Sequence, residues 1–223
     1  VLMAALKDIK RKIGAVHKTK QITKAMNMVA ASKFKSAQNR MESFRPYAGK
    51  FMDVLSSLAL RVDAKNHPLL AVRDPKKIRV ICMTSDRGLC GGFNTNLIKA
   101  AERFVKDKLA QGKEVALVPV GRKGRDYFRK KAVLMNERTD VFSKFDMSLA
   151  VKISDDVIPP FTAGEYDELY LIYNEFVSVS TQKPVVVRLF PLPTIGQEEG
   201  IDPEKRVEYI YEPSDEVLLD KLL

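Results

Sequence analysis

Apolar and small side chains recur at steps of three and four residues from Leu6 to Val62. This spacing is close to the 3.5-residue period of a coiled-coil helix, and it predicts a helix far longer than those of ordinary globular domains. The positions that form this apolar stripe are Leu6, Ile9, Ile13, Val16, Thr19, Ile22, Met26, Val29, Ala30, Phe34, Ala37, Met41, Phe44, Ala48, Phe51, Leu55, Leu58 and Val62. Only Gly14 interrupts the pattern before Pro46, where we expect a bend or a restart. At about 1.5 Å per residue the helix would reach roughly 80 Å, so it must project from the rest of the chain, and its stripe needs a partner.

From residue 78 onward, short apolar runs alternate with helical patterns. The expected order is a strand at 78–83, a helix capped by Asn94 or Thr95 and closed by Gly112, a strand at 115–120, a short basic helix at 122–131 and a strand at 132–135. This β-α-β-α-β order predicts a mostly parallel sheet with right-handed crossovers.

A further helix is expected at 148–158, where Pro159 and Pro160 would end it. The strands at 169–173 and 185–190 lie too close in sequence for a helical crossover, so we expect an antiparallel hairpin at the edge of the sheet. Near the end, residues 212–216 have the composition of a helix start, with Ser214 as the N-cap and acidic residues in the first turn.

The predicted fold class is therefore α/β: a long N-terminal coiled-coil helix followed by a Rossmann-like α/β domain with a mostly parallel sheet and an antiparallel edge hairpin. The expected divisions are the helix at 1–62, a linker at 63–77, the α/β domain at 78–190, an irregular exit segment at 191–212 and the start of a C-terminal helix at 213–223.

The net charge of +10 lies entirely on the predicted long helix. From Lys7 to Arg61 there are thirteen Lys or Arg residues against three acidic ones, and the other residues are balanced. A solvated face is one interpretation, but Glu at four-residue spacing from Lys is nearly absent. The helix should therefore attract a polyanion, an anionic membrane surface or a protein with an acidic rim.

Composition excludes several other classes of protein. No run of about 20 apolar residues predicts a membrane span. The basic residues follow the apolar N-terminal head instead of preceding it, which argues against a secretory signal. Cys82 and Cys90 are too few for a disulfide framework or a zinc site.

A glycine-rich turn follows the first predicted strand, where nucleotide phosphates often bind in α/β proteins. Its residues Asp86, Gly88, Cys90, Gly91 and Gly92 match neither the dinucleotide fingerprint nor a P-loop, so we interpret the turn as structural. Next to the glycines, Asp86 and Arg87 could form an ion pair or face a partner.

Catalysis is not expected from these residues. Cys90 could act as a nucleophile only with a base nearby, and His17 and His67 lie in other segments, where surface positions are expected. No paired carboxylates or metal-ligand spacings stand out, so the sequence predicts a non-catalytic chain without metal or cofactor. Nucleic-acid binding by the basic helix remains the alternative function. Against it, the helix has no Tyr or Trp before Tyr47 to stack on bases.

Two segments of the chain are recognisable: DIKRKIGAVHKTKQITKAMNMVAASKFKSAQ, at residues 8–38, and TSDRGLCGGFNTN, at residues 84–96. Both closely resemble the gamma subunit of F-type ATP synthases. The resemblance implies a non-catalytic rotor shaft that carries torque between the membrane c-ring and the catalytic ring. The implied partners are the alpha and beta subunits around the shaft, with the epsilon subunit and the c-ring at the foot, and no nucleic acid. It also implies a peripheral position on the cytoplasmic face of the bacterial inner membrane or the equivalent organelle face.

Carried over from the family, Lys24, Met26 and Lys33 are expected to face the beta subunits. Arg87, and Lys99 on the following helix, are expected to contact an acidic loop of beta. The family continues past the segment EPSDEVLLDKLL into a second long helix, so the resemblance implies that this chain lacks most of that C-terminal helix.

Overall fold

The computed structural model describes residues 2–61, 67–143 and 147–192, together with Glu212, Ser214 and Leu218. The chain divides into two compact units, Val1–Leu55 and Ser56–Leu223. The first unit consists of one helix, and the second contains an α/β sheet.

Helix α1 spans Leu2–Arg61 and is continuous through Pro46, so of the bend or restart expected at this proline, the restart is wrong. Its apolar stripe is exposed: Ile13, Ile22 and Met26 have exposed fractions of 58%, 61% and 66%. Polar side chains bond along the helix itself. The Thr19 hydroxyl donates to the Ala15 carbonyl at 3.0 Å, for example. An exposed stripe of this length is typical of a helix that packs against another helix.

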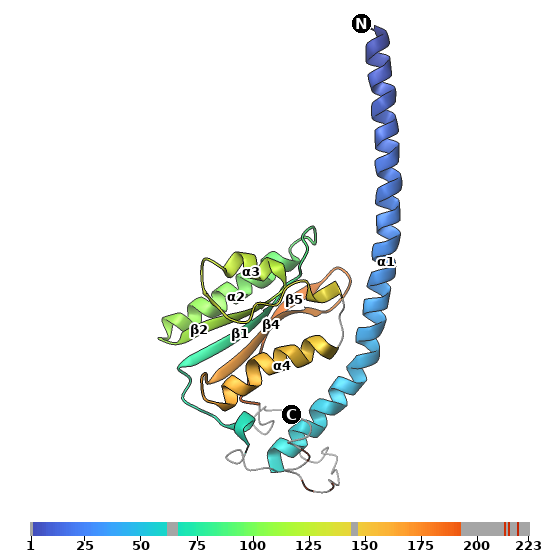
Figure 1. The fold of residues 1–223 in the computed structure, drawn as a ribbon. Helices are drawn as coiled ribbons and strands as arrows, with labels where there is room; N and C mark the ends of the chain where they lie inside the picture. Colours follow the sequence, from blue (N-terminus) through green and yellow to red (C-terminus); the bar gives the residue numbers. More distant parts are fainter. Residues whose placement is uncertain are drawn as a thin grey trace. The chain divides into compact units, whose positions relative to one another are not determined.

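The second unit is a five-stranded sheet with helices on both faces (Figure 1). The strand order is β3-β2-β1-β4-β5. Pairs β1–β2, β1–β4 and β2–β3 are parallel, and β4–β5 is antiparallel, as expected from the sequence. Figure 1 shows α2 and α3 on one face of the sheet and α4 on the other. The predicted fold class is confirmed.

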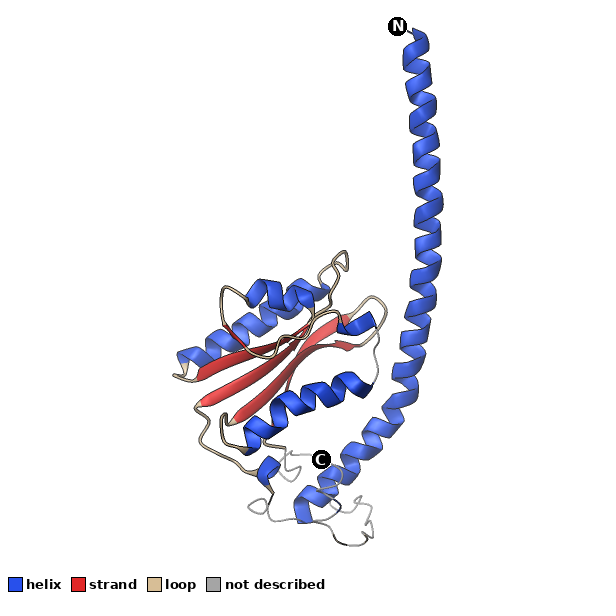
Figure 2. Cartoon of the chain, viewed as in Figure 1, coloured by secondary structure: helices blue, strands red, loops and turns tan. Residues whose placement is uncertain are grey.

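The elements of this unit follow the expected order (Figure 2). Their bounds are η1 at Pro68–Leu70, β1 at Lys77–Met83, α2 at Phe93–Ala110, β2 at Glu114–Val120, α3 at Arg122–Phe128, β3 at Val133–Leu134, η2 at Val141–Ser143, α4 at Met147–Thr162, β4 at Glu168–Phe176 and β5 at Gln182–Phe190. Helix α3 and strand β3 are shorter than the sequence pattern indicates. After α2, Gly112 adopts a φ of 75°, the left-handed conformation that commonly follows a helix.

Helix α4 continues through Pro159 and Pro160, so the expectation that these prolines end it is wrong. A proline inside a helix leaves the carbonyl four residues earlier without its donor. Here the Asn136 side-chain amide donates to the Asp156 carbonyl at 3.5 Å, which replaces the N–H that Pro160 lacks. Arg73 holds the end of the helix: its guanidinium donates to the Phe161 carbonyl at 2.8 Å and the Tyr166 carbonyl at 3.1 Å.

Two apolar cores pack on the two faces of the sheet. The core under α2 includes Leu97, Ala101 and Val80, each fully buried. The core under α4 centres on Phe161 and Tyr166, whose ring centroids lie 5.4 Å apart. Burial of large apolar side chains contributes about 1.5–3 kcal/mol each, so these two cores supply most of the stability of the unit.

Most of the predicted exit segment and C-terminal helix lie outside the described residues. Among the few described residues of this part of the chain, the Leu218 N–H donates to the Ser214 carbonyl at 3.1 Å. The four-residue separation of these groups is that of an α-helical hydrogen bond. Among the helices of the described part of the chain, none has the length and apolar character needed to cross a bilayer.

Candidate functional site

The glycine-rich turn connects β1 to α2 at the carboxyl end of β1. Asn94, only 9% exposed, organises this turn from inside α2. Its side chain accepts the Ser85 N–H at 2.9 Å and donates to the Arg87 carbonyl at 3.2 Å. The residue at the N-cap of α2 is Gly92, which makes no side-chain capping bond. The expected cap at Asn94 or Thr95 is therefore wrong, because Asn94 holds the turn instead.

Helix α3 is capped by residues that lie far from it in the sequence, namely Thr84, Ser85 and Asp86. An Asp86 carboxylate oxygen accepts the Arg122 N–H at 2.9 Å, the Ser85 carbonyl accepts the Lys123 N–H at 3.2 Å, and the Thr84 hydroxyl accepts the Gly124 N–H at 2.8 Å. These donors are first-turn amides, which have no partner inside a helix. We name this arrangement the α3 cap; it joins β1 to α3.

The same Asp86 oxygen also accepts the Asp140 N–H at 2.9 Å. One carboxylate therefore fastens the turn after β1 to the start of α3 and to the loop after β3. The sequence leaves two uses open for Asp86 and Arg87: an ion pair between them, or contact with a partner. Among the ion pairs that the described residues form, none joins Asp86 to Arg87. Arg87 itself is exposed.

The backbone of the turn has unusual conformations at two residues, one on each side of Cys90. Leu89 and Gly91 have φ values of 60° and 57°. A left-handed conformation is costly for leucine, at roughly 1–2 kcal/mol, and is accessible to glycine. The Leu89 side chain is fully exposed, so its own packing does not hold it at the tip of the turn. The residues on either side are held instead, because the Asn94 side-chain amide donates to the Arg87 carbonyl and to the Cys90 sulfur.

The two cysteines have opposite environments. Cys82 on β1 is buried, which raises the pKa of its thiol to about 12. Cys90 is exposed, and its sulfur accepts the Asn94 side-chain amide at 3.1 Å. His67 is only 9% exposed, so its expected surface position is wrong: its Nδ1 accepts the Leu69 N–H at 3.3 Å and caps η1. In the described part of the chain no group of three or more His, Cys, Asp or Glu side chains is placed to hold a metal ion.

The predicted contact residues fall in both units. Lys24, Met26 and Lys33 lie on α1 and are exposed. Arg87 lies in the turn before α2, and Lys99 lies on α2, where it is also exposed. The structure thus presents all five side chains to solvent, Arg87 and Lys99 on the α/β unit and the other three on the long helix.

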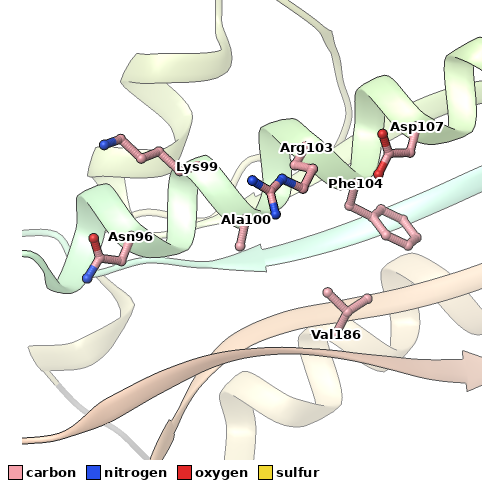
Figure 3. A pocket seen from close by; sticks show the side chains of 7 residues that line it. All are labelled: Asn96, Lys99, Ala100, Arg103, Phe104, Asp107 and Val186. Carbon is pink, nitrogen blue, oxygen red and sulfur yellow. The ribbon is translucent and has the colours of Figure 1, made fainter.

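A groove that the sequence does not reveal runs between α2 and β5 (Figure 3). Its volume is about 420 Å³. It is lined by Asn96, Lys99, Ala100, Arg103, Phe104 and Asp107 of α2, and by Val186 of β5. The helical spacing of Asn96, Ala100 and Phe104 places these residues on one side of α2, but only the sheet order shows that β5 lies beside them.

Comparisons with known proteins agree along nearly the whole chain. The family model described as ATP synthase matches residues 5–223. The ATP synthase gamma chain of Syntrophus aciditrophicus is 67% identical over 221 residues, which are 99% of this chain and 76% of that protein. The gamma chain of Syntrophobacter fumaroxidans is 48% identical over 224 residues, with the same coverage of both chains.

Among solved structures, the central stalk and c-ring of the Tetrahymena thermophila mitochondrial ATP synthase contains a similar chain. The TM-score is 0.63 at 25% identity, over 90% of this chain and 84% of that one. The rotor of the Euglena gracilis mitochondrial ATP synthase gives 0.51 at 18% identity, over 81% of this chain and 61% of that one, which supports the fold alone.

Proposed function

The chain belongs to the ATP synthase gamma family, and we propose that it is the non-catalytic central-stalk subunit that carries torque between the c-ring and the catalytic ring. The observation that carries this proposal is the 67% identity to a gamma chain over 99% of the sequence. The alternative of a nucleic-acid-binding protein finds no support among the relatives.

Helix α1 has the properties that a rotating shaft requires. Its 60 residues correspond to about 90 Å at about 1.5 Å per residue. Its basic side chains, among them Lys24 and Lys33, are exposed. Exposed ion pairs contribute only about 0.2–1 kcal/mol each, so acidic neighbours can replace one another around the helix as it turns.

We place the alpha and beta subunits around α1, and the epsilon subunit and c-ring against the α/β unit. The c-ring named with the Tetrahymena central stalk supports this arrangement by analogy. With these partners the subunit is held at the membrane through the complex. The proposed location is the cytoplasmic face of the bacterial inner membrane or the equivalent organelle face.

The non-catalytic role rests on the family and on the surroundings of the candidate nucleophile. In the described part of the chain, the Cys90 sulfur bonds to the Asn94 amide and the Arg87 carbonyl, neither of which is a base. His67 already serves as a cap. In the proposed complex, the chemistry belongs to the other subunits.

Charge reversal at two exposed residues tests the proposal. In the assembled complex, K24E and R87E should each lower ATP-driven proton pumping more than they lower ATP hydrolysis, because Lys24 is proposed to face the beta subunits and Arg87 an acidic loop of beta. Pumping is measured in vesicles by the quench of a pH-sensitive dye. K152E, at an exposed position on α4, is the matched control. Unchanged turnover and pumping would remove Lys24 and Arg87 as contacts, and failure of the chain to assemble with alpha and beta would overturn the function.

A further inference from the structure

The groove between α2 and β5 has an apolar floor. Phe104 and Val186 point toward each other from the helix and the strand (Figure 3). The Phe104 ring packs on Tyr170 of β4, with centroids 4.7 Å apart. Val186 is 43% exposed although it pairs with buried Ile172 in the sheet. The α2 face of β5 is therefore an apolar sheet surface with open space beside the helix.

Cationic side chains border this floor. Lys99 and Arg103 line the groove from α2, and both are exposed. Arg188, exposed on β5, shares the face of Val186 because it lies two residues further along the strand. One acidic residue, Asp107, lines the groove at the far end. In the described part of the chain, no ion pair joins Lys99 or Arg103 to an acid. Since like charges four residues apart on a helix repel each other, the border is suited to acidic groups.

The geometry favours a helix over an added strand as the occupant. Helices on a sheet pack about 8–10 Å apart, about twice the spacing of neighbouring strands, so a helix beside α2 would lie over β5. A strand added to the outer edge of β5 would meet Pro184, which has no N–H to donate. Such a strand would also leave the Val186 face uncovered.

We propose that this groove docks an amphipathic helix of a neighbouring subunit in the ATP synthase complex, with its apolar side on Phe104 and Val186 and acidic residues against Lys99 and Arg103. The inference rests on the proposed function, since it assumes that the chain assembles into that complex. It adds Arg103, Phe104 and Val186 to the proposed contact residues. It also specifies that the segment bound there is helical and carries acidic residues.

Photocrosslinking in the assembled complex tests the proposal. The photoreactive residue p-benzoylphenylalanine replaces Val186 in one variant and Val187 in the control. The two valines are 43% and 40% exposed and lie on opposite faces of β5. We expect the Val186 variant to crosslink to a helical segment of another subunit that contains acidic residues, mapped by mass spectrometry, and the Val187 variant not to reach that segment.

Charge reversal provides a second readout. Added to the Val186 variant, R103E should lower the crosslink yield by about threefold to tenfold, and K152E on α4 should leave it unchanged. A complex that assembles and pumps protons without this crosslink would overturn the groove inference and leave the proposed function standing. Crosslinks to an extended segment, or a yield insensitive to R103E, would also overturn it. Failure to assemble would overturn both proposals.

Discussion

At Asp86, one carboxylate oxygen accepts backbone N–H groups from Arg122 and Asp140, which are 36 and 54 residues away. The sequence shows an acid beside Arg87 and glycines, which leaves an ion pair and a partner contact open. Neither local spacing nor charge could identify the true acceptor role, because both donors are backbone amides brought near by the parallel sheet.

Replacing Asp86 with alanine should lower the free energy of unfolding by about 1–2 kcal/mol, because α3 loses a capping acceptor and the loop after β3 loses its anchor. Urea denaturation measures the change. Amide hydrogen exchange should also quicken at Arg122 and Asp140. As a control, D74A alters an exposed acid and should change stability little. Equal stability and exchange in D86A and D74A would contradict the α3 cap.

Cys82 should make stability depend on pH above 9. Burial raises the pKa of its thiol from 9.0 to about 12, so the folded state favours the protonated form. The resulting stabilisation is complete below pH 9 and is lost as pH rises from 9.0 to about 12. Between pH 8 and about pH 10.5, the free energy of unfolding of the wild type should fall by about 2 kcal/mol more than that of C82A. Parallel pH profiles of the two proteins would contradict this effect.

Among the secondary-structure elements, the hydrophobic period was sufficient in three cases. It identified α1, the parallel strands and the edge hairpin. It failed at α4, where Pro159 and Pro160 predict an end. Asn136, 20 residues from Asp156, supplies a replacement donor, and such tertiary donors leave no trace in local sequence. It also missed the groove, since nothing local places Val186 beside Phe104.

Gly121 should not tolerate a side chain where β2 turns into α3. A Cβ there would lie 2.1 Å from the Thr84 carbonyl oxygen, and the φ of 99° is unfavourable for other residues. We expect G121A to lower the free energy of unfolding by about 3 kcal/mol or more. Gly164 is the matched control: its φ is 77°, but a Cβ there meets nothing within 4 Å. G164A should cost only about 1 kcal/mol, from the backbone alone. Equal costs in urea titrations would show that the contact with Thr84 is unimportant.

For the whole molecule, the division into a long basic helix and an α/β unit could be predicted because a coiled-coil period cannot be mistaken for the period of a strand. The contact residues Lys24, Met26, Lys33, Arg87 and Lys99 came only from the family resemblance, and they stay predictions. Exposure places them at the surface without identifying what they touch.

The exposed stripe of α1 should make the isolated chain self-associate as concentration rises, because burying apolar surface contributes about 25 cal/mol per Å². Sedimentation velocity should show species larger than a monomer. Replacing Ile13 and Ile22 with glutamate should shift the distribution toward monomer, and replacing Lys12 and Lys20, off the stripe, with glutamine should not. A wild-type monomer at high concentration would contradict the role assigned to the stripe.

The α3 cap also constrains the order of folding. Helix α3 has seven residues, too few to be stable alone. Its capping groups, which directly follow β1, lie 36 to 40 residues earlier in the chain, so they reach it only after β1 and β2 have paired across the intervening α2. Helix α3 should therefore form late, after the centre of the sheet. During synthesis from the N-terminus, β1 leaves the ribosome first, so the cap is already available when α3 emerges.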